Sequence, residues 1–213
     1  MIIHRVMNEI FRSRSHIAVL RALLDTTNGY TGNHIARLAG IHPRSAFYAL
    51  TSLESLGLVR RQRGGRDHLF TFNDQHVLVH EAIIPLFRSE QHFHDHVHSA
   101  IAQQLKRIVV SAVIFGSVAH RTEGPLSDLD LCCIVETEDI KETVQRILDR
   151  KAPLFHRTLN VTVAPLIFTV DEFRAKARSQ NKLVYNIVKY GQLLVGKPPR
   201  LLLDDKTKRT KKR

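Results

Sequence analysis

The stretch VVSAVIFGSVAHRTEGPLSDLDLCCIV, residues 109–135, decides the fold of the second half of this chain. It contains an apolar run, a turn of small residues, a polar loop and a second apolar run that opens with two acids. Gly116 and Ser117 form the turn, and Asp128 and Asp130 follow after ten intervening residues. Side chains at positions i and i+2 of a strand point to the same face. The two carboxylates are therefore expected to lie together at the start of a strand.

This combination of residues suits a nucleoside triphosphate. Such a ligand needs donors for its phosphate oxygens and carboxylates for the divalent cation that neutralises them. Gly116 lets the backbone approach closely, Ser117 offers a hydroxyl and an amide, and a helix that starts there aims its positive end at the anion. Asp128 and Asp130 are the expected catalytic residues and the expected ligands of Mg²⁺ or Mn²⁺.

The residues Gly116-Ser117, Ala119 and Ser127-Asp128-Leu129-Asp130-Leu131 closely resemble the motif of the minimal nucleotidyltransferases of the DNA polymerase beta superfamily. The spacing from Ser117 to Asp128 fits that motif. The resemblance implies Mg²⁺-dependent transfer of a nucleoside monophosphate from a nucleoside triphosphate to a hydroxyl acceptor. It also makes Gly116, Ser117 and Ser127 the expected nucleotide-binding residues.

One part of that family's pattern is missing. The family usually places a third carboxylate on the next strand, but residues 150–170 contain neither Asp nor Glu. The strand expected there offers Asn160, Thr162 and Ala164, none of which takes up a proton near neutral pH. Two interpretations stay open: a one-metal reaction that takes its base from the acceptor or a partner, or a domain that binds nucleotide without turning it over.

Strands and helices alternate around the motif. Strands are expected over residues 109–115, 129–135 and 159–168, and helices directly after the Gly-Ser turn and over residues 139–150 and 171–190. This order predicts an α/β nucleotidyltransferase domain with a small mixed sheet over residues 108–200.

The first part of the chain, residues 1–72, has a different organisation. Apolar spacing predicts helices over residues 15–24, 31–40 and 43–57, the second of them capped by Thr31. A hairpin over residues 58–72 follows and turns at Gly64-Gly65. Helix, helix, turn, helix and hairpin in this order resemble the winged helix-turn-helix family, and the class of the whole chain is α+β. In that family the third helix enters the major groove and the wing contacts the backbone or the minor groove. The resemblance implies double-stranded DNA as a partner and favours a homodimer that reads paired half-sites.

Two sets of side chains are expected to contact DNA. They are Arg44, Ser45 and Tyr48 near the start of the third helix, and Arg60, Arg61, Arg63 and Arg66 in the hairpin. Four arginines around a Gly-Gly turn favour phosphate contacts over a merely solvated hairpin. Phe47 and Leu50, by contrast, are expected to belong to the core.

The charge of the chain is uneven. Its formal net charge is +12, of which residues 1–72 carry +6, residues 73–200 carry +2 and the last thirteen residues carry +4. This distribution points to a polyanionic partner for the first third of the chain.

The adjacent Cys132 and Cys133 point to opposite faces of a strand and cannot easily form a disulfide bond with each other. These cysteines favour a reduced cytoplasmic protein. No run of residues is apolar enough for a membrane span.

The remaining segments suggest less chemistry. Residues 73–107 are expected to form a helical linker, and the basic residues 201–213 a disordered tail. His92, His94, His96 and His98 alternate in sequence, which on a helix spreads them over divergent faces and favours an exposed helix over a metal site.

The function expected from these features is a DNA-bound nucleotidyltransferase coupled to transcriptional regulation, whose acceptor can be a protein partner. The alternative is a nucleotidyltransferase fold without activity that acts as a nucleotide sensor, as a regulator that binds a partner, or as an antitoxin beside a toxin partner.

Overall fold

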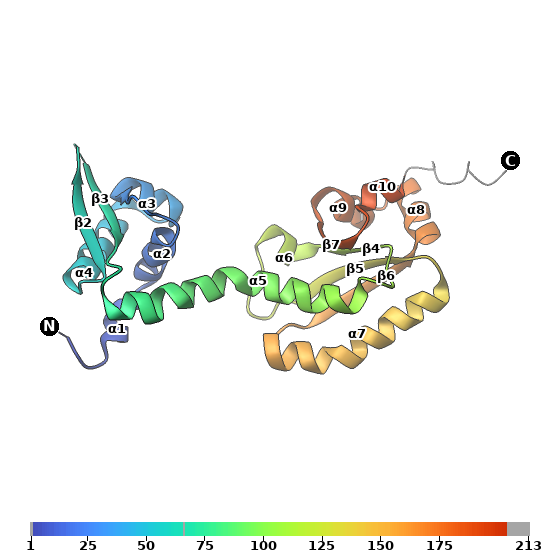
Figure 1. Cartoon of the computed structure of the whole chain (residues 1–213). Helices are drawn as coiled ribbons and strands as arrows, with labels where there is room; N and C mark the ends of the chain where they lie inside the picture. The colour runs from blue at the N-terminus through green and yellow to red at the C-terminus, as the bar shows by residue number, and fades with distance from the viewer. Residues whose placement is uncertain (1, 66, 204–213) are drawn as a thin grey trace. The chain divides into compact units, whose positions relative to one another are not determined.

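The chain consists of two compact units, Met1–Phe93 and His94–Arg213, in a computed structural model that describes residues 2–65 and 67–203. Figure 1 shows the elements in chain order. The helix α5 (Ile84–Leu105) crosses the division, so its first ten residues belong to unit 1 and the remainder to unit 2. Each unit has its own hydrophobic core.

Unit 1 contains the three helices and the hairpin that the sequence predicts. Its elements before α5 are α1 (Val6–Ile10), α2 (Arg14–Leu23), β1 (Tyr30–Thr31), α3 (Gly32–Leu38), α4 (Pro43–Ser55), β2 (Val59–Gly64), β3 (Asp67–Phe72) and the π-helix η1 (Val79–Ile83). The strands form a small antiparallel sheet in the order β1-β3-β2. The sequence pattern did not reveal α1 and β1, because five and two residues are too short to establish a period.

Local signals explain where the helices of unit 1 begin. The Thr31 hydroxyl accepts a hydrogen bond from the amide of His34 at 3.3 Å and caps α3, as predicted. Pro43 occupies the first turn of α4, where its missing N–H costs nothing. The hairpin register pairs Gly64 with Asp67, so the turn also lies where the Gly-Gly pair predicts.

The helix α4 corrects one prediction about the core. Leu50 is fully buried, as expected, but the side chain of Phe47 is 53% exposed. The residues of α4 that face the core are Ala46, Ala49, Leu50 and Leu53, which follow the spacing i, i+3, i+4 and i+7 of one helical stripe. Phe47 lies beside that stripe, so the expectation that it belongs to the core is wrong.

Unit 2 is built on a small mixed sheet with the order β6-β5-β4-β7. After α5 its elements are β4 (Ser111–Ile114), α6 (Gly116–His120), β5 (Leu129–Val135), α7 (Glu138–Leu159), β6 (Val163–Thr169), α8 (Val170–Arg178), α9 (Lys182–Tyr190), β7 (Gln192–Gly196) and α10 (Pro199–Leu202). Strand β5 runs parallel to β6 and antiparallel to β4, and β4 is antiparallel to β7. The α+β class with a small mixed sheet is therefore confirmed.

Helices cover both faces of this sheet (Figure 1). Leu131, Cys133 and Val135 of β5 belong to the core shared with α5 and α7. Cys132 and Ile134 point the other way, into the core shared with α8 and α9. The two cysteines are free, and burial raises the pKa of Cys133 to about 12. Asp130 lies two residues before Cys132, so its side chain is on the same face of β5, the face that α8 and α9 cover.

Several elements of unit 2 differ from the sequence prediction. The strand expected over residues 159–168 is β6, which begins at Val163. Helix α7 runs on to Leu159 with Pro153 inside it, and the segment expected as one helix over residues 171–190 is two helices. The break lies at Gln180, which has a φ of +55°, and Asn181 then caps α9. Strand β7 was not predicted, because its apolar run of three residues is too short to establish a strand pattern.

Residues 73–107, expected as a linker, contribute to both cores. Val79, Ile83 and Phe87 pack in unit 1, whereas Ile101 and Leu105 are fully buried in unit 2. None of the helices in the described part of the chain combines the length and hydropathy that a membrane crossing requires. The expected tail over residues 201–213 begins too early, because Leu201 and Leu202 belong to α10 and Leu202 is buried in a core of unit 2. Residues 204–213 of that tail lie outside the described residues.

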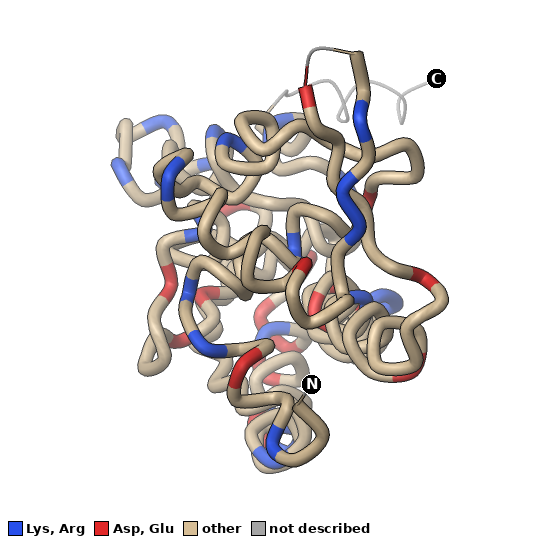
Figure 2. Tube along the Cα trace, turned by 90° about the vertical axis from the view of Figure 1, so that its left-hand side faces the viewer, with Lys and Arg blue, Asp and Glu red and all other residues tan. Residues whose placement is uncertain are grey.

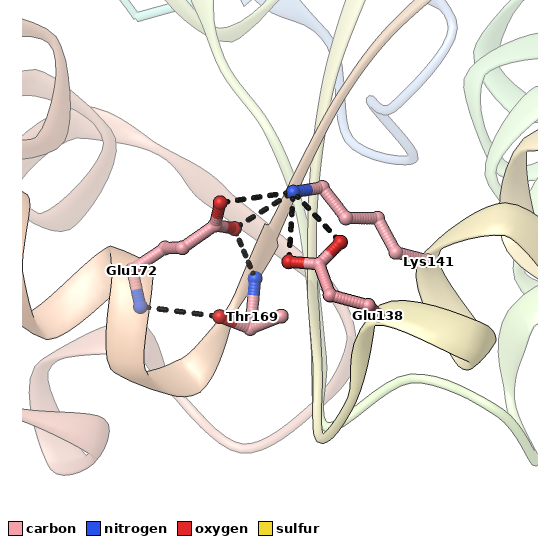
Figure 3. A network of polar contacts seen from close by, with 4 residues as sticks. All are labelled: Glu138, Lys141, Thr169 and Glu172. Atoms are coloured by element: carbon pink, nitrogen blue, oxygen red, sulfur yellow. Dashed lines mark hydrogen bonds and ion pairs between the residues drawn. The ribbon is translucent and has the colours of Figure 1, made fainter.

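A polar network joins α7 to the start of α8 (Figure 3). The Lys141 Nζ donates to both carboxylate oxygens of Glu172, at 3.0 and 2.9 Å, and lies 3.4 Å from the carboxylate of Glu138. Glu172 in turn accepts from the amide of Thr169, whose hydroxyl accepts from the amide of Glu172. This capping box fixes the point where β6 ends and α8 begins.

Candidate nucleotide site and candidate DNA-binding residues

Asp128 directly precedes β5 and Asp130 is the second residue of this strand, which lies between β4 and β6 in the sheet. The amide of Phe115, at the end of β4, donates to the carbonyl of Asp130 at 3.0 Å. On the other side, the amide of Leu129 donates to the carbonyl of Thr162 at 2.8 Å, just before β6. Asp128 is exposed and Asp130 is half-buried. The backbone is thus held on both sides while the carboxylates remain accessible.

Gly116 is packed directly against Asp130. Its φ is +70°, a conformation that residues with a Cβ rarely adopt. A Cβ at this position would overlap Oδ2 of Asp130 and lie 2.9 Å from its Cγ. A side chain at position 116 would have to displace the Asp130 carboxylate, whereas glycine lets the start of α6 lie directly against it.

The two serines of the motif have different surroundings. The Ser117 hydroxyl has no hydrogen-bond partner among the described residues, and the side chain is half-exposed. The carbonyl of Ser117 accepts from the amide of Thr122 at 3.0 Å, which closes the loop after α6. The Ser127 hydroxyl instead accepts from the amide of Gly124 at 3.0 Å. Ser127 thus shapes the tight turn that precedes Asp128, whereas the hydroxyl of Ser117 is free for a ligand.

The charges of this site favour a cation. Burial raises the pKa of the Asp130 carboxyl, and the negative charge of Asp128 raises it further. A divalent cation between the two carboxylates would relieve this repulsion. Mg²⁺ is commonly held by one or two carboxylates, with phosphate oxygens and water as its other ligands. The donor set of Asp128 and Asp130 fits one such ion.

A third acid does not complete the set in the described part of the chain. Within residues 2–65 and 67–203, no group of three or more His, Cys, Asp or Glu side chains could hold a metal ion. The register of β5 and β6 places Ala164 beside Asp130. Paired residues of neighbouring strands share a face, so an alanine methyl stands next to the carboxylate.

The sequence around this site matches a known protein family. Residues 98–194 match the nucleotidyltransferase domain family. The matched region begins in α5, ends in β7 and contains both aspartates and the Gly-Ser turn. Unit 2 therefore carries a nucleotidyltransferase domain.

Over its whole length the chain has only weak similarity to proteins of known structure. No curated protein matches the chain. Among solved structures, a singly substituted variant of Lactococcus lactis ZitR is 16% identical with a TM-score of 0.29, and covers 67% of this chain and 73% of its own. A doubly substituted apo form of ZitR is 15% identical with a TM-score of 0.30, and covers 71% of this chain and 87% of its own. Scores this low assign neither a fold nor a function.

In unit 1, the exposed side of α4 gathers part of the first predicted DNA set. The Arg44 guanidinium donates to the hydroxyl of Tyr48 at 3.1 Å and lies 5.5 Å from the centre of its ring. Tyr48 is 57% exposed and meets the exposed ring of Phe47 edge to face, with 6.3 Å between ring centres. Ser45 is half-buried. One basic and two aromatic side chains thus form an exposed cluster near the start of α4.

The arginines of the hairpin do not form a single cluster. Figure 2 shows basic positions spaced along β2. Arg60 lies 3.4 Å from Asp74 and donates to Gln75, whereas Arg61 lies 3.1 Å from Glu54 of α4. Arg63 is exposed and has no acidic partner among the described residues, and Arg66 lies outside the described residues. The charge of Arg63 is therefore the most available of the three described arginines.

The histidines of α5 remain dispersed. His92, His94 and His96 are exposed, and His98 is half-buried. Only His94 and His98, one turn apart, meet, with 3.7 Å between ring centres. Burial, followed by the charge of His94, lowers the pKa of His98, which favours its neutral form.

Three residues beside the nucleotide motif were not predicted from the sequence, namely His120, Tyr190 and Gln192. The side-chain amide of Gln192 donates to the carbonyl of Ala119 at 3.0 Å, and the ring of His120 meets that of Tyr190. The only sequence signal was the position of His120 three residues after Ser117, because Tyr190 and Gln192 lie about seventy residues away.

Proposed function

We propose that unit 2 binds a nucleoside triphosphate with a divalent cation and transfers its nucleoside monophosphate to a hydroxyl acceptor, while unit 1 binds double-stranded DNA. The observation that carries the first part is the contact between Gly116 and Asp130. It places the first amides of α6, which no side chain caps, beside the carboxylate of Asp130, two residues from that of Asp128. Triphosphates and their metal ions need these two kinds of group side by side.

In this proposal each residue has a distinct task. Asp128 and Asp130 would hold Mg²⁺ or Mn²⁺, and the cation would supply neutralisation of the phosphate charge. Gly116 leaves room for a phosphate oxygen near the backbone, and the amide and hydroxyl of Ser117 donate to it. Ser127 holds the turn that presents Asp128. Positioning and charge stabilisation then supply most of the catalysis.

A second function is favoured by Ala164. Because an alanine lies beside Asp130 in the register, no side chain of β6 takes the proton of an acceptor hydroxyl at that position. A domain of this kind would bind nucleotide without turnover and would act as a sensor, as a regulator that binds a partner, or as an antitoxin. The two functions share the binding site and differ only in whether transfer follows.

The test incubates the full chain with Mg²⁺ and each α-labelled nucleoside triphosphate, with DNA, with protein partners or alone. We expect nucleotide binding, and transfer of label to an acceptor, both of which Asp128→Asn plus Asp130→Asn removes. The matched control is Asp149→Asn, which changes an exposed acid of α7 away from the site. Labelling that persists in the double variant would exclude the proposed site. Binding without transfer to any acceptor would favour the sensor.

DNA binding by unit 1 is supported by the exposed cluster on α4 and by the unpaired charge of Arg63. Arg44 and Tyr48 are placed to contact bases or backbone, and Arg63 to contact a phosphate. We expect Arg44→Ala and Arg63→Ala each to weaken binding of the full chain to its operator in a gel-shift titration. Arg88→Ala, an exposed arginine of α5, is the control. A homodimer on paired half-sites would double these contacts.

A further inference from the structure

Two exposed rings meet at the far end of α6. His120 is the last residue of α6, and Tyr190 is the last residue of α9. Their ring centres lie 5.4 Å apart with 54° between the planes. Tyr190 is 46% exposed and His120 is exposed as well. The pair therefore offers aromatic surface to a ligand from solvent.

The chain holds these rings in a fixed place. The side-chain amide of Gln192 donates to the carbonyl of Ala119, next to His120, at 3.0 Å. Gly191 links Tyr190 to β7 at a point where a Cβ would overlap Val113 and the carbonyl of Ile187. Gln192 itself pairs with Ile114 at the end of β4. Both ends of the contact are thus anchored to the central sheet.

The rings lie close to the proposed phosphate site. The same short helix begins at Gly116, against Asp130, and ends at His120, so one turn of helix separates the two features. Cys132 and Ile134, which share a face of β5 with Asp130, pack in one core with Val184 and Ile187 of α9. Tyr190 is therefore on the face of the sheet to which Asp130 belongs.

A cation borders the rings. The Lys189 Nζ lies 5.0 Å from the centre of the Tyr190 ring and donates to the hydroxyl of Tyr185 at 3.0 Å. The hydrogen bond to Tyr185 raises the pKa of Lys189, so this side chain is charged near neutral pH. Exposed aromatic rings with a neighbouring cation are a common platform for nucleobases.

We propose that His120 and Tyr190 form the stacking platform for the base of the nucleotide whose triphosphate is bound at Gly116, Ser117 and the two aspartates. This inference rests on the proposed nucleotide binding of unit 2. Every base has a π face, so the platform accepts all four bases and favours purines, whose rings offer the larger area.

The test compares two ligands that share their phosphates but not their base. Dissociation constants of ATP and of inorganic tripolyphosphate are measured calorimetrically with Mg²⁺ on the full chain. We expect Tyr190→Ala and His120→Ala each to weaken ATP binding roughly tenfold, a value within the range for base stacking. Tripolyphosphate affinity should remain unchanged. Tyr190→Phe, which keeps the ring, should bind ATP like the wild type.

Two further variants separate stacking from packing. Tyr190→Leu keeps apolar bulk without a π face and should bind ATP as weakly as Tyr190→Ala. Leu183→Ala, at an exposed position of the same helix, should leave both affinities unchanged. Thermal melts confirm that each variant is folded. Equal loss of ATP and tripolyphosphate affinity, full rescue by leucine, or no loss at all would overturn the platform. A wild type that binds neither ligand would overturn the proposed function itself, and the platform with it.

Discussion

At the scale of single residues, position 116 has the least room for change. Gly116→Ala would place a methyl group onto Oδ2 of Asp130, and alanine at a φ of +70° costs about 1 kcal/mol in addition. We expect loss of calorimetric ATP binding. Gly40→Ala is the matched control, because Gly40 has a φ of +63° and no atom within 4 Å of an added Cβ. If both variants retained ATP affinity, the close approach of Gly116 to Asp130 would have no role in binding.

Position 164 decides between the two proposed functions. Ala164→Asp would set a carboxylate beside Asp130, in the register of β5 and β6. If the missing base limits transfer, this variant should transfer label roughly a hundredfold faster, the usual scale of general base catalysis. Ala175→Asp, at an exposed position of α8, controls for added charge. Unchanged transfer with intact nucleotide binding would show that the alanine is not what limits the reaction.

At the scale of elements, the ion pair between α7 and α8 predicts a pH dependence. The hydrogen bond from Lys141, with that from Thr169, lowers the pKa of Glu172. The stabilisation is therefore complete above the ordinary carboxyl pKa and disappears as the pH falls through the lowered value. Because both side chains are partly exposed, Lys141→Met should reduce the free energy of unfolding at pH 7 by only about 0.5–1 kcal/mol.

Urea titrations at pH 7 and at about pH 2.5 measure this difference, the lower value lying below the ordinary carboxyl range. Wild type and Lys141→Met should differ at pH 7 and converge in acid. Lys182→Met, at an exposed position of α9, should follow the wild type at both values. A constant difference between wild type and Lys141→Met would mean that lost packing, not charge, explains the effect.

At the scale of the whole molecule, the uneven charge predicts how DNA binding responds to salt. Residues 1–72 carry half of the net charge of +12. Binding that rests on phosphate contacts weakens linearly in log–log terms as salt rises, and removing one contact lowers the slope by about one. We expect Arg63→Ala to lower the slope by about one and Arg88→Ala to leave it unchanged. Fluorescence anisotropy titrations at salt concentrations from about 50 to about 300 mM measure both slopes.

What the sequence determined on its own was local. The Gly-Ser turn, the Asp-x-Asp strand, the Thr31 cap and the Gly-Gly hairpin each depend on residues within a few positions of one another, and their chemistry is readable from spacing alone. Only the tertiary structure decided that Ala164 lies beside Asp130, that Phe47 faces away from the core and that Tyr190 meets His120. Strand register and helix orientation join segments far apart in the chain, and no local pattern fixes them.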